Sequence, residues 1–275
     1  MDRKNSEAIE RAQILNQFYT QSCDEEQRLG SRHGSIEFLT TVRYIEKYLE
    51  KGNKILEVGA GTGRYSLYYA KQGYDVTAIE YVRHNLDVLQ SNVTEGMAIR
   101  AEQGDAVNLS RFADNSFDIT LVLGPLYHLY TKEDQEKAIR EAVRVTKPDG
   151  ILAVADLSSD SIMVDWVLKD RQLIQGYKKD FDENFKIINY PGGVFAAFYI
   201  QEFLDWMSQF PVAFLHNVAT DGMARHVREE IDQLDDEEFD LWLHYHFSTC
   251  ERMEVQGYSN HLLYIGRKSR RPERP

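Results

Sequence analysis

The stretch ILEVGAGTGRYS, residues 55–66, decides the fold. An apolar run leads directly into three glycines, Gly59, Gly61 and Gly63, and the residues after them are typical of a helix. Glycines permit the tight turn and let a ligand lie against backbone N–H groups at a helix start. The dinucleotide fingerprint would need a glycine at position 64, which is Arg64, and no Gly-Lys-Ser/Thr follows. The pattern therefore excludes a P-loop and departs from the dinucleotide turn.

Short apolar runs alternate with helical stretches on the carboxyl side of this turn. We expect strands at 54–58, 75–79, 98–103, 117–123 and 151–155, helices at 64–71, around Leu86 and Leu89 and from Thr131 onward, and a turn at 147–150. Strands that alternate with helices of about ten residues predict a parallel sheet covered on both faces. Two later runs, 212–218 and 259–266, are expected to be the last strands of the same sheet.

The residues outside these strands and helices are expected to pack over the sheet. Helices are predicted at 6–22 and 35–49, and the alternation breaks over 158–211, where a helix near 162–177, an aromatic-rich stretch and a helix near 201–210 form an insertion. The prediction is one domain. Its parts are an N-terminal cap (1–50), a core (51–157), a lid insertion (158–211), the last strands (212–266) and a basic tail (267–275).

One acidic stretch accounts for much of the net charge of −12. Residues 229–240 hold eight acids, with Ile231, Leu234 and Phe239 spaced among them. Such a pattern indicates a solvated helix–turn–helix edge.

Composition narrows the class of protein. No apolar run of the 275 residues approaches the ~20 needed to cross a bilayer, and the charged start lacks the apolar segment of a secretory signal. The two cysteines, Cys23 and Cys250, are far apart in the chain, as expected in a reducing cytosol. The net negative charge argues against an extended surface for binding nucleic acid.

Four landmarks in order carry a family resemblance. Glu57 precedes the glycine triplet, Glu80 ends the second strand, Asp105 follows the third, and the stretch 123–128 follows the fourth. In this, residues 50–156 resemble a class I S-adenosylmethionine (SAM)-dependent methyltransferase. The resemblance implies a Rossmann-like α/β fold whose seven-stranded sheet is mostly parallel, with an antiparallel last strand.

The same resemblance implies a SAM site beyond the carboxyl ends of the strands. The implied cofactor contacts are Glu57, Gly59, Ala60, Gly61, Gly63, Glu80, Tyr81, Asp105, Ala106, Leu123 and Gly124. A subset of small-molecule methyltransferases closes an N-terminal segment over the cofactor, which would bring in Tyr19 and Arg28.

Methyl transfer from a sulfonium is an in-line displacement that depends mainly on alignment and exclusion of water. Tyr127 and His128 follow the fourth strand and are the candidate catalytic residues; His128 is either a base or a packing residue. Enzymes that methylate the amino group of adenine or glutamine carry an Asn or Asp at the position of Gly124. Its absence here argues against a nucleic-acid target.

A small-molecule acceptor is therefore the expectation. The candidate acceptor contacts are Tyr127, Phe195, Tyr199 and His261, the last being otherwise ordinary strand surface. No metal is expected, because His244 and His246 cannot share one helix face and no zinc-site spacing stands out. A SAM-binding sensor without turnover, and an RNA or protein methyltransferase, are the alternatives. The acceptor atom and the oligomeric state stay open.

Overall fold

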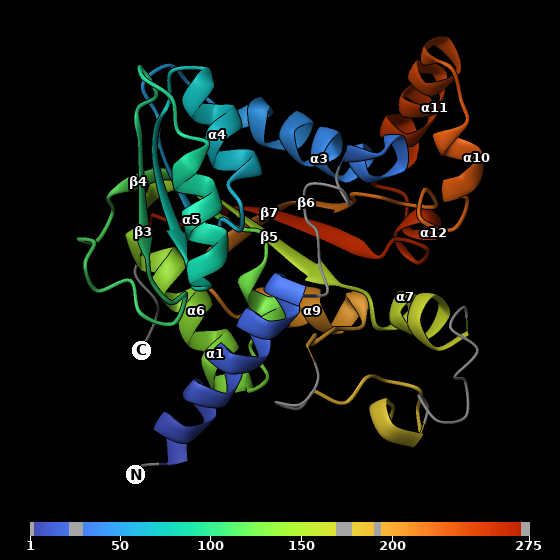
Figure 1. Cartoon of the computed structure of the whole chain (residues 1–275), viewed down its shortest axis with the longest axis horizontal. Helices are drawn as coiled ribbons and strands as arrows, with labels where there is room; N and C mark the ends of the chain where they lie inside the picture. Colours follow the sequence, from blue (N-terminus) through green and yellow to red (C-terminus); the bar gives the residue numbers. More distant parts are fainter. Residues whose placement is uncertain (1–2, 22–29, 169–177, 190–193, 271–275) are drawn as a thin grey trace.

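The computed structural model describes residues 3–21, 30–168, 178–189 and 194–270. Within them, seven strands form one sheet in the order β3-β2-β1-β4-β5-β7-β6 (Figure 1). They are β1 (Lys54–Val58), β2 (Asp75–Glu80), β3 (Ile99–Gln103), β4 (Phe117–Val122), β5 (Thr146–Leu157), β6 (Val212–Ala219) and β7 (His261–Lys268). Strands β1 to β5 pair in parallel, and β7 runs antiparallel to both of its neighbours. The expected fold class is confirmed.

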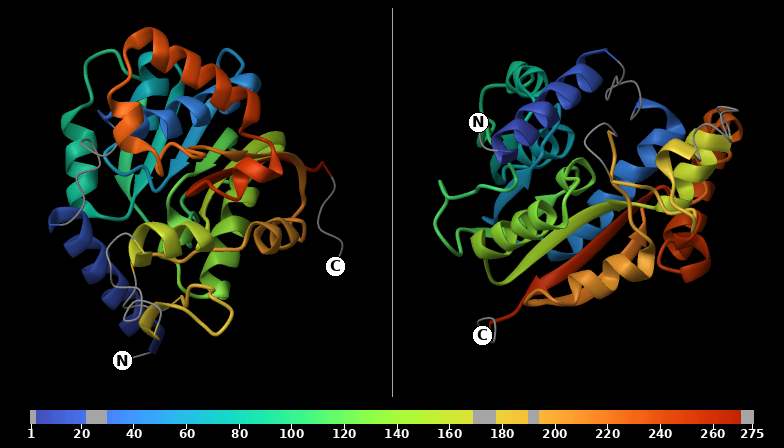
Figure 2. Two further views of the ribbon diagram at one scale, coloured as in Figure 1. Left: turned by 90° about the vertical axis from the view of Figure 1, so that its right-hand side faces the viewer. Right: turned by 90° about the horizontal axis from the view of Figure 1, so that it is seen from below.

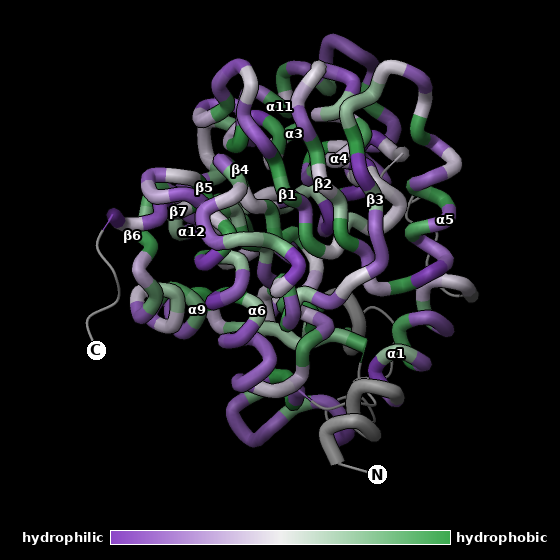
Figure 3. The backbone as a smooth tube through the Cα atoms, turned by 90° about the vertical axis from the view of Figure 1, so that its left-hand side faces the viewer, coloured by the Kyte–Doolittle hydropathy of each residue, from purple (hydrophilic) through white to green (hydrophobic). Residues whose placement is uncertain are grey.

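Helices cover both faces of this sheet (Figure 2). The buried cluster on one face includes residues of α6 (Lys132–Val145) and α9 (Ile200–Met207). The cluster on the other face includes residues of α3 (Arg32–Ile45) and α4 (Arg64–Lys71), and α5 (Arg83–Ser91) packs beside them. In β1, Ile55 and Leu56 are both fully buried and belong to opposite clusters. Burial on both faces explains why the central strands are nearly continuous apolar runs, visible as green tube in Figure 3.

Two expected boundaries differ from the structure. The predicted turn 147–150 lies inside β5, where the register with β4 shifts and Asp149 adopts a positive φ of 63°. The Pro148-Asp149-Gly150 sequence therefore makes a bulge that begins a strand. In the insertion, the expected helix near 162–177 starts as α7 (Ser159–Ile162) and continues as a π-helical stretch, Met163–Leu168; its remainder lies outside the described residues.

The acidic stretch forms the predicted helix–turn–helix edge. Helix α10 (Arg228–Asp232) is followed by α11 (Asp236–Thr249), which begins with a reciprocal capping box between Asp235 and Glu238. Ile231 is buried in a small cluster with Ile36 of α3, while most of the acids remain exposed. A short helix, α12 (Met253–Gln256), precedes β7.

Three short or peripheral elements complete the chain. Helix α1 (Arg3–Gln21) contacts α5, and two 3₁₀ turns, η1 (Glu46–Tyr48) and η2 (Pro125–His128), follow α3 and β4. None of the helices in the described ranges has the length and apolar character that a membrane span requires.

Candidate active site

A cavity that is open at its mouth lies beyond the carboxyl ends of β1, β2 and β4. This is the edge at which open α/β sheets bind ligands. Most of the expected site residues line it: Tyr19, Glu57, Gly59, Ala60, Gly61, Glu80, Tyr81, Asp105, Ala106, Leu123, Gly124, Tyr127 and His128. Gly63 lies in the same turn without lining the cavity, and Arg28 falls outside the described residues.

The glycine turn needs its glycines for two separate reasons. Gly59, Gly61 and Gly63 have φ values of 74°, 56° and 93°, a region that other residues rarely adopt. A Cβ on Gly59 would stand 2.6 Å from Cγ of Pro125, and one on Gly63 would stand 2.5 Å from Cγ of Leu89. Backbone conformation and close packing together fix the turn against β4 and α5.

Glu80 holds this turn to the end of β2. Its Oε2 accepts from the backbone N–H of Gly61 at 2.7 Å, and its Oε1 accepts from that of Val82 at 2.7 Å. A carboxylate oxygen has two acceptor positions, which suits a group that can hold backbone N–H groups and a ligand hydroxyl. The carboxylate is therefore rigidly placed at the cavity wall.

Glu57 is the most buried acid of the cavity wall, with 1% of its surface exposed. Its Oε2 accepts a hydrogen bond from the hydroxyl of Ser66. Burial raises the pKa of Glu57 to about 8, so the carboxyl is mostly protonated at pH 7. A positive charge brought next to it would favour the ionised form.

Asp105 forms an ion pair with Arg11, a residue that the sequence did not mark as part of the site. Its Oδ2 pairs with the guanidinium of Arg11 in α1, and its Oδ1 accepts from the N–H of Val107 at 3.2 Å. The guanidinium carbon of Arg11 also stands 4.7 Å from the centre of the Tyr81 ring. Arg11 thus fastens α1 to the ends of β2 and β3.

Helix α1 spans the cavity from this ion pair to the end of β4. Leu15 is buried one turn after Arg11, and Tyr19 follows one turn later. The Tyr19 hydroxyl lies 2.7 Å from Nε2 of His128. The expectation that an N-terminal segment with Tyr19 covers the cavity agrees with this arrangement.

The hydrogen bonds of His128 fix its tautomer. Nδ1 lies 2.9 Å from the carbonyl oxygen of Val194, which can only accept, so Nδ1 carries the proton and Nε2 accepts from Tyr19. Burial lowers the pKa of His128 to about 4. The imidazole is neutral at pH 7 and its lone pair is engaged, so this closed arrangement favours packing over base chemistry.

The Tyr127 side chain, in the η2 turn, contacts both the residue after β4 and the insertion. Its hydroxyl donates to the carbonyl oxygen of Leu123 at 2.9 Å, and its ring centre lies 6.0 Å from that of Phe195. The N–H of Ala196 donates to the carbonyl oxygen of Tyr127 at 2.7 Å. The insertion is therefore tied directly to the η2 turn.

The two aromatic residues of the insertion that were predicted to contact the acceptor, Phe195 and Tyr199, lie in different places. Phe195 packs against Phe18, Tyr127 and His128, just behind the cavity wall. Tyr199 precedes α9 and donates its hydroxyl to the carbonyl oxygen of Asn184, inside the insertion. Tyr199 is not brought to the cavity.

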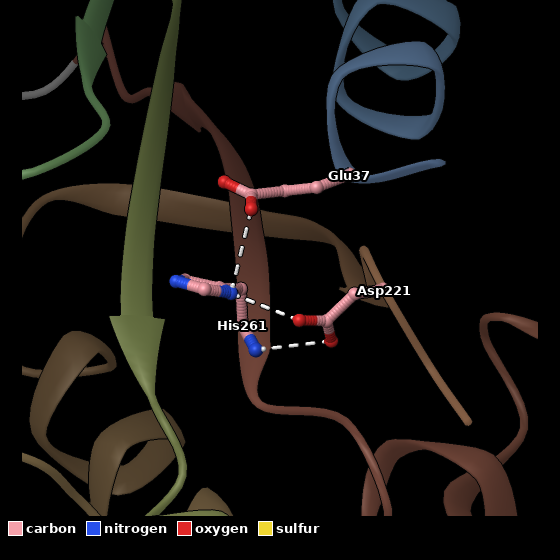
Figure 4. Close-up of side chains that lie close together, drawn as sticks. All are labelled: Glu37, Asp221 and His261. Carbon is pink, nitrogen blue, oxygen red and sulfur yellow. Dashed lines mark hydrogen bonds and ion pairs between the residues drawn. The ribbon is translucent and has the colours of Figure 1, made fainter. Parts of the chain in front are cut away.

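His261 is not strand surface. It is 9% exposed, and its Nδ1 lies 2.9 Å from Oδ2 of Asp221 and 3.5 Å from Oε2 of Glu37 (Figure 4). Glu37, from α3, lines the cavity. Ligand atoms of these three residues lie within 4.8 Å of one another, a grouping that the spacing along the chain does not reveal.

Sequence reasoning missed some lining residues beside the known motifs and others from elements distant in the chain. Arg11, Leu15, Glu37, Thr62, Arg64, Tyr65, Val82 and Asn85 also line the cavity. Arg64 and Tyr65 directly follow the glycine turn and could have been found from it. Nothing in the sequence around Arg11 or Glu37 marks those two.

The donor set suits the cofactor that the resemblance implies. Gly61 and Gly124 line the cavity without a side chain, and the carboxylates of Glu80 and Asp105 suit ligand hydroxyl and amino groups. Glu57 suits a cationic group. When bound, SAM would supply an activated methyl group; these residues would hold and orient it.

Comparisons with known proteins agree with this fit. Residues 56–154 match the family described as a methyltransferase domain. A demethylmenaquinone methyltransferase of Paenarthrobacter aurescens is 39% identical over 107 residues, which are 39% of this chain and 40% of the relative. A glycine/sarcosine N-methyltransferase of Aphanothece halophytica is 28% identical over 123 residues, or 44% of this chain and 46% of the relative. The chain thus spans less than half the length of these two relatives.

A solved structure extends the likeness over nearly the whole chain. A SAM-dependent methyltransferase from Thermotoga maritima superposes with a TM-score of 0.57 at 18% identity, covering 94% of this chain and 99% of the other. At this identity the match concerns the fold, including the region outside residues 56–154.

Proposed function

We propose that this chain, which carries a SAM-dependent methyltransferase domain, transfers the methyl group of SAM to a small-molecule acceptor and leaves S-adenosylhomocysteine. The observation that carries the proposal is the glycine turn held by Glu80, which puts Gly61 and a fixed carboxylate on one cavity wall. The relatives are named for methylation of demethylmenaquinone and of glycine or sarcosine, and these names support a small acceptor.

The proposal divides the cavity into two halves. The cofactor half comprises Glu57, the glycine turn, Glu80 and Asp105. The acceptor half comprises Tyr127, His128 and Glu37 in the cavity wall, with Phe195 and His261 packed directly behind them. We assign Tyr127 to orientation of the acceptor beside the transferring methyl group, and His128 to holding Tyr19 and α1 in the closed position.

Enclosure supports this chemistry because displacement at a sulfonium needs alignment and exclusion of water. Helix α1 covers the cavity through Arg11, Leu15 and Tyr19, and the insertion contacts the η2 turn from the other side. An acidic chain with an enclosed cavity fits a small acceptor better than a nucleic acid. A cytosolic location is part of the proposal and depends on the sparse cysteines.

Turnover is the test. The purified chain is incubated with methyl-labelled SAM and a small-molecule extract of cells, and S-adenosylhomocysteine is followed by mass spectrometry. The proposal expects conversion that depends on the extract, with the label in a compound of low mass. SAM binding without turnover would point to a sensor, and label in RNA or protein would point to the third class; either result contradicts the proposal.

A further inference from the structure

Asp221 and His261 form a buried pair at the edge of the acceptor half. Asp221 follows β6, and His261 is the first residue of β7, at the same edge of the sheet as the cavity. Nδ1 of His261 lies 2.9 Å from Oδ2 of Asp221. Carboxylate oxygens can only accept, so the proton of the neutral imidazole is on Nδ1 and the lone pair is on Nε2.

Asp221 is held in place by donors from the loop before β7. Its Oδ1 accepts from the hydroxyl of Ser259 at 2.6 Å and from the backbone N–H groups of Asn260 and His261 at 2.9 and 3.1 Å. Burial opposes ionisation, but the hydrogen bonds from His261 and Ser259 outweigh it and lower the pKa of Asp221 to about 2. The residue is therefore a fixed anion whose second oxygen orients the imidazole.

The other ring nitrogen has a different environment. Nε2 makes no hydrogen bond to any residue that the structure describes, and it is not among the polar atoms completely shielded from solvent. Figure 4 shows Nδ1 turned toward Asp221 and Glu37, with the second ring nitrogen on the opposite side. Nε2 is thus an oriented, accessible acceptor.

His261 is not itself among the residues that line the cavity, but two of its neighbours are. Glu37, whose Oε2 is 3.5 Å from Nδ1, and Tyr127, whose ring centre is 6.4 Å from that of His261, both line the cavity. The titratable groups that face His261 are Glu37 from α3, Asp221 from the loop after β6 and Tyr127 from η2.

We propose that His261 is the proton acceptor for the acceptor's nucleophile, oriented by Asp221 as a positioning residue, and that this nucleophile is a hydroxyl group; this rests on the proposed function. The O–H proton passes to Nε2 as the oxygen–methyl bond forms and the methyl–sulfur bond breaks. The sulfonium becomes a neutral thioether, and the imidazolium later releases its proton to water. A hydroxyl benefits because its oxygen becomes a better nucleophile as the proton leaves.

The contrast with His128 supports this assignment. His128 is also beside Tyr127, but its Nε2 accepts from Tyr19 and no carboxylate orients its Nδ1 among the described residues. One histidine of the acceptor half thus has its lone pair engaged, and the other has it available.

The test combines turnover with a spectroscopic readout. His261→Gln should lower conversion of SAM with the cell extract at pH 7 by ~100-fold or more, the usual contribution of a general base, with SAM affinity unchanged within twofold. His226→Gln, which changes a histidine that hydrogen-bonds to the carbonyl oxygen of Tyr258, should keep full turnover. Asp221→Asn should lower turnover with SAM affinity unchanged within twofold, because an amide oxygen is a weaker acceptor for the Nδ1 proton and orients the imidazole less firmly.

Nitrogen-15 NMR of histidine-labelled protein, without any acceptor, should show His261 protonated at Nδ1 and unprotonated at Nε2. Should Asp221→Asn fail to fold, this tautomer and the His261→Gln rate decide. Retained turnover in His261→Gln, or a proton on Nε2, overturns the proposal. So does turnover abolished by EDTA and restored by Mn²⁺ or Zn²⁺ in the wild type but not in Glu37→Gln, which would identify a metal site. A wild type that neither binds nor converts SAM refutes the proposed function itself.

Discussion

The cofactor half and the acceptor half of the cavity are built from different kinds of sequence. Glu57, the glycine turn, Glu80 and Asp105 each lie at or directly after a strand end within one continuous stretch of about fifty residues. The acceptor half is assembled from α1, α3, η2, the insertion and the start of β7. The first half is specified by local turns, and the second by tertiary packing.

This difference predicts a difference in response to mutation. In the cofactor half, a single glycine carries both the backbone conformation and the space for the ligand. In the acceptor half, packing contacts are shared among side chains from several elements, so single substitutions of the packing residues there should change affinity in smaller steps.

The largest effect is expected at Gly61. Gly61→Arg fills the cavity wall and forces a bulky residue into a φ of 56°, so SAM affinity should fall by at least ~100-fold, or about 2.7 kcal/mol. Gly96→Arg is the matched control, because Gly96 also has a positive φ, of 90°, and a Cβ there meets nothing within 4 Å. Titration calorimetry on both variants makes the comparison; equal losses would mean that general strain, and not the cavity, is responsible.

Phe195 and Tyr199 test the acceptor half. Phe195→Ala removes a ring that supports Tyr127 and His128, and the KM for the acceptor should rise ~10-fold, the scale of lost aromatic packing. Tyr199→Ala removes a hydrogen bond within the insertion, and KM should stay within twofold. Steady-state kinetics with the active extract fraction checks both. A larger effect at Tyr199 than at Phe195 would contradict the location of the acceptor half.

Glu57 predicts a pH dependence of cofactor binding. Its pKa of about 8 means that the carboxyl is protonated at pH 7, and a bound cationic group favours the ionised form, so binding releases a proton below pH 8. SAM affinity should therefore rise severalfold from pH 6.5 to about 8 and then level off. Glu57→Gln should remove the slope. Calorimetry in buffers of different ionisation enthalpy measures the released proton, and a flat wild-type profile would show that no cation approaches Glu57.

The smallest effect concerns α1. Arg11→Met breaks the pair with Asp105, so SAM should dissociate roughly fivefold faster by stopped-flow fluorescence, as loss of about 1 kcal/mol predicts. Arg83→Met breaks an exposed i,i+4 pair with Asp87 on the neighbouring helix and should leave the rate unchanged. A similar change in both variants would mean that α1 does not close the cavity.

The sequence predicts the cofactor half of the cavity better than the acceptor half. The mostly parallel sheet, the glycine turn and the positions of Glu80 and Asp105 at the edge could be predicted, because parallel strands bring their carboxyl ends to one edge. Thr131 caps α6 as its motif indicated, accepting from the N–H of Asp134 at 3.2 Å. Each of these features depends on neighbours a few residues away.

The pairing of Arg11 with Asp105, 94 residues apart, and of Asp221 with His261, 40 residues apart, could not be predicted. Such contacts depend on how α1 and the loop after β6 pack against the finished sheet, and no periodicity or turn signal encodes that packing. Tyr199 is the opposite case. It was predicted to contact the acceptor because it is an aromatic residue of the insertion, but its side chain packs within the insertion and not at the cavity.

The measurement that tests the central claim most directly is a calorimetric titration of the purified, folded chain with SAM. The account predicts one site per chain with a dissociation constant in the micromolar range, and competition by S-adenosylhomocysteine. A folded sample that binds neither compound would contradict the assignment of this cavity to SAM.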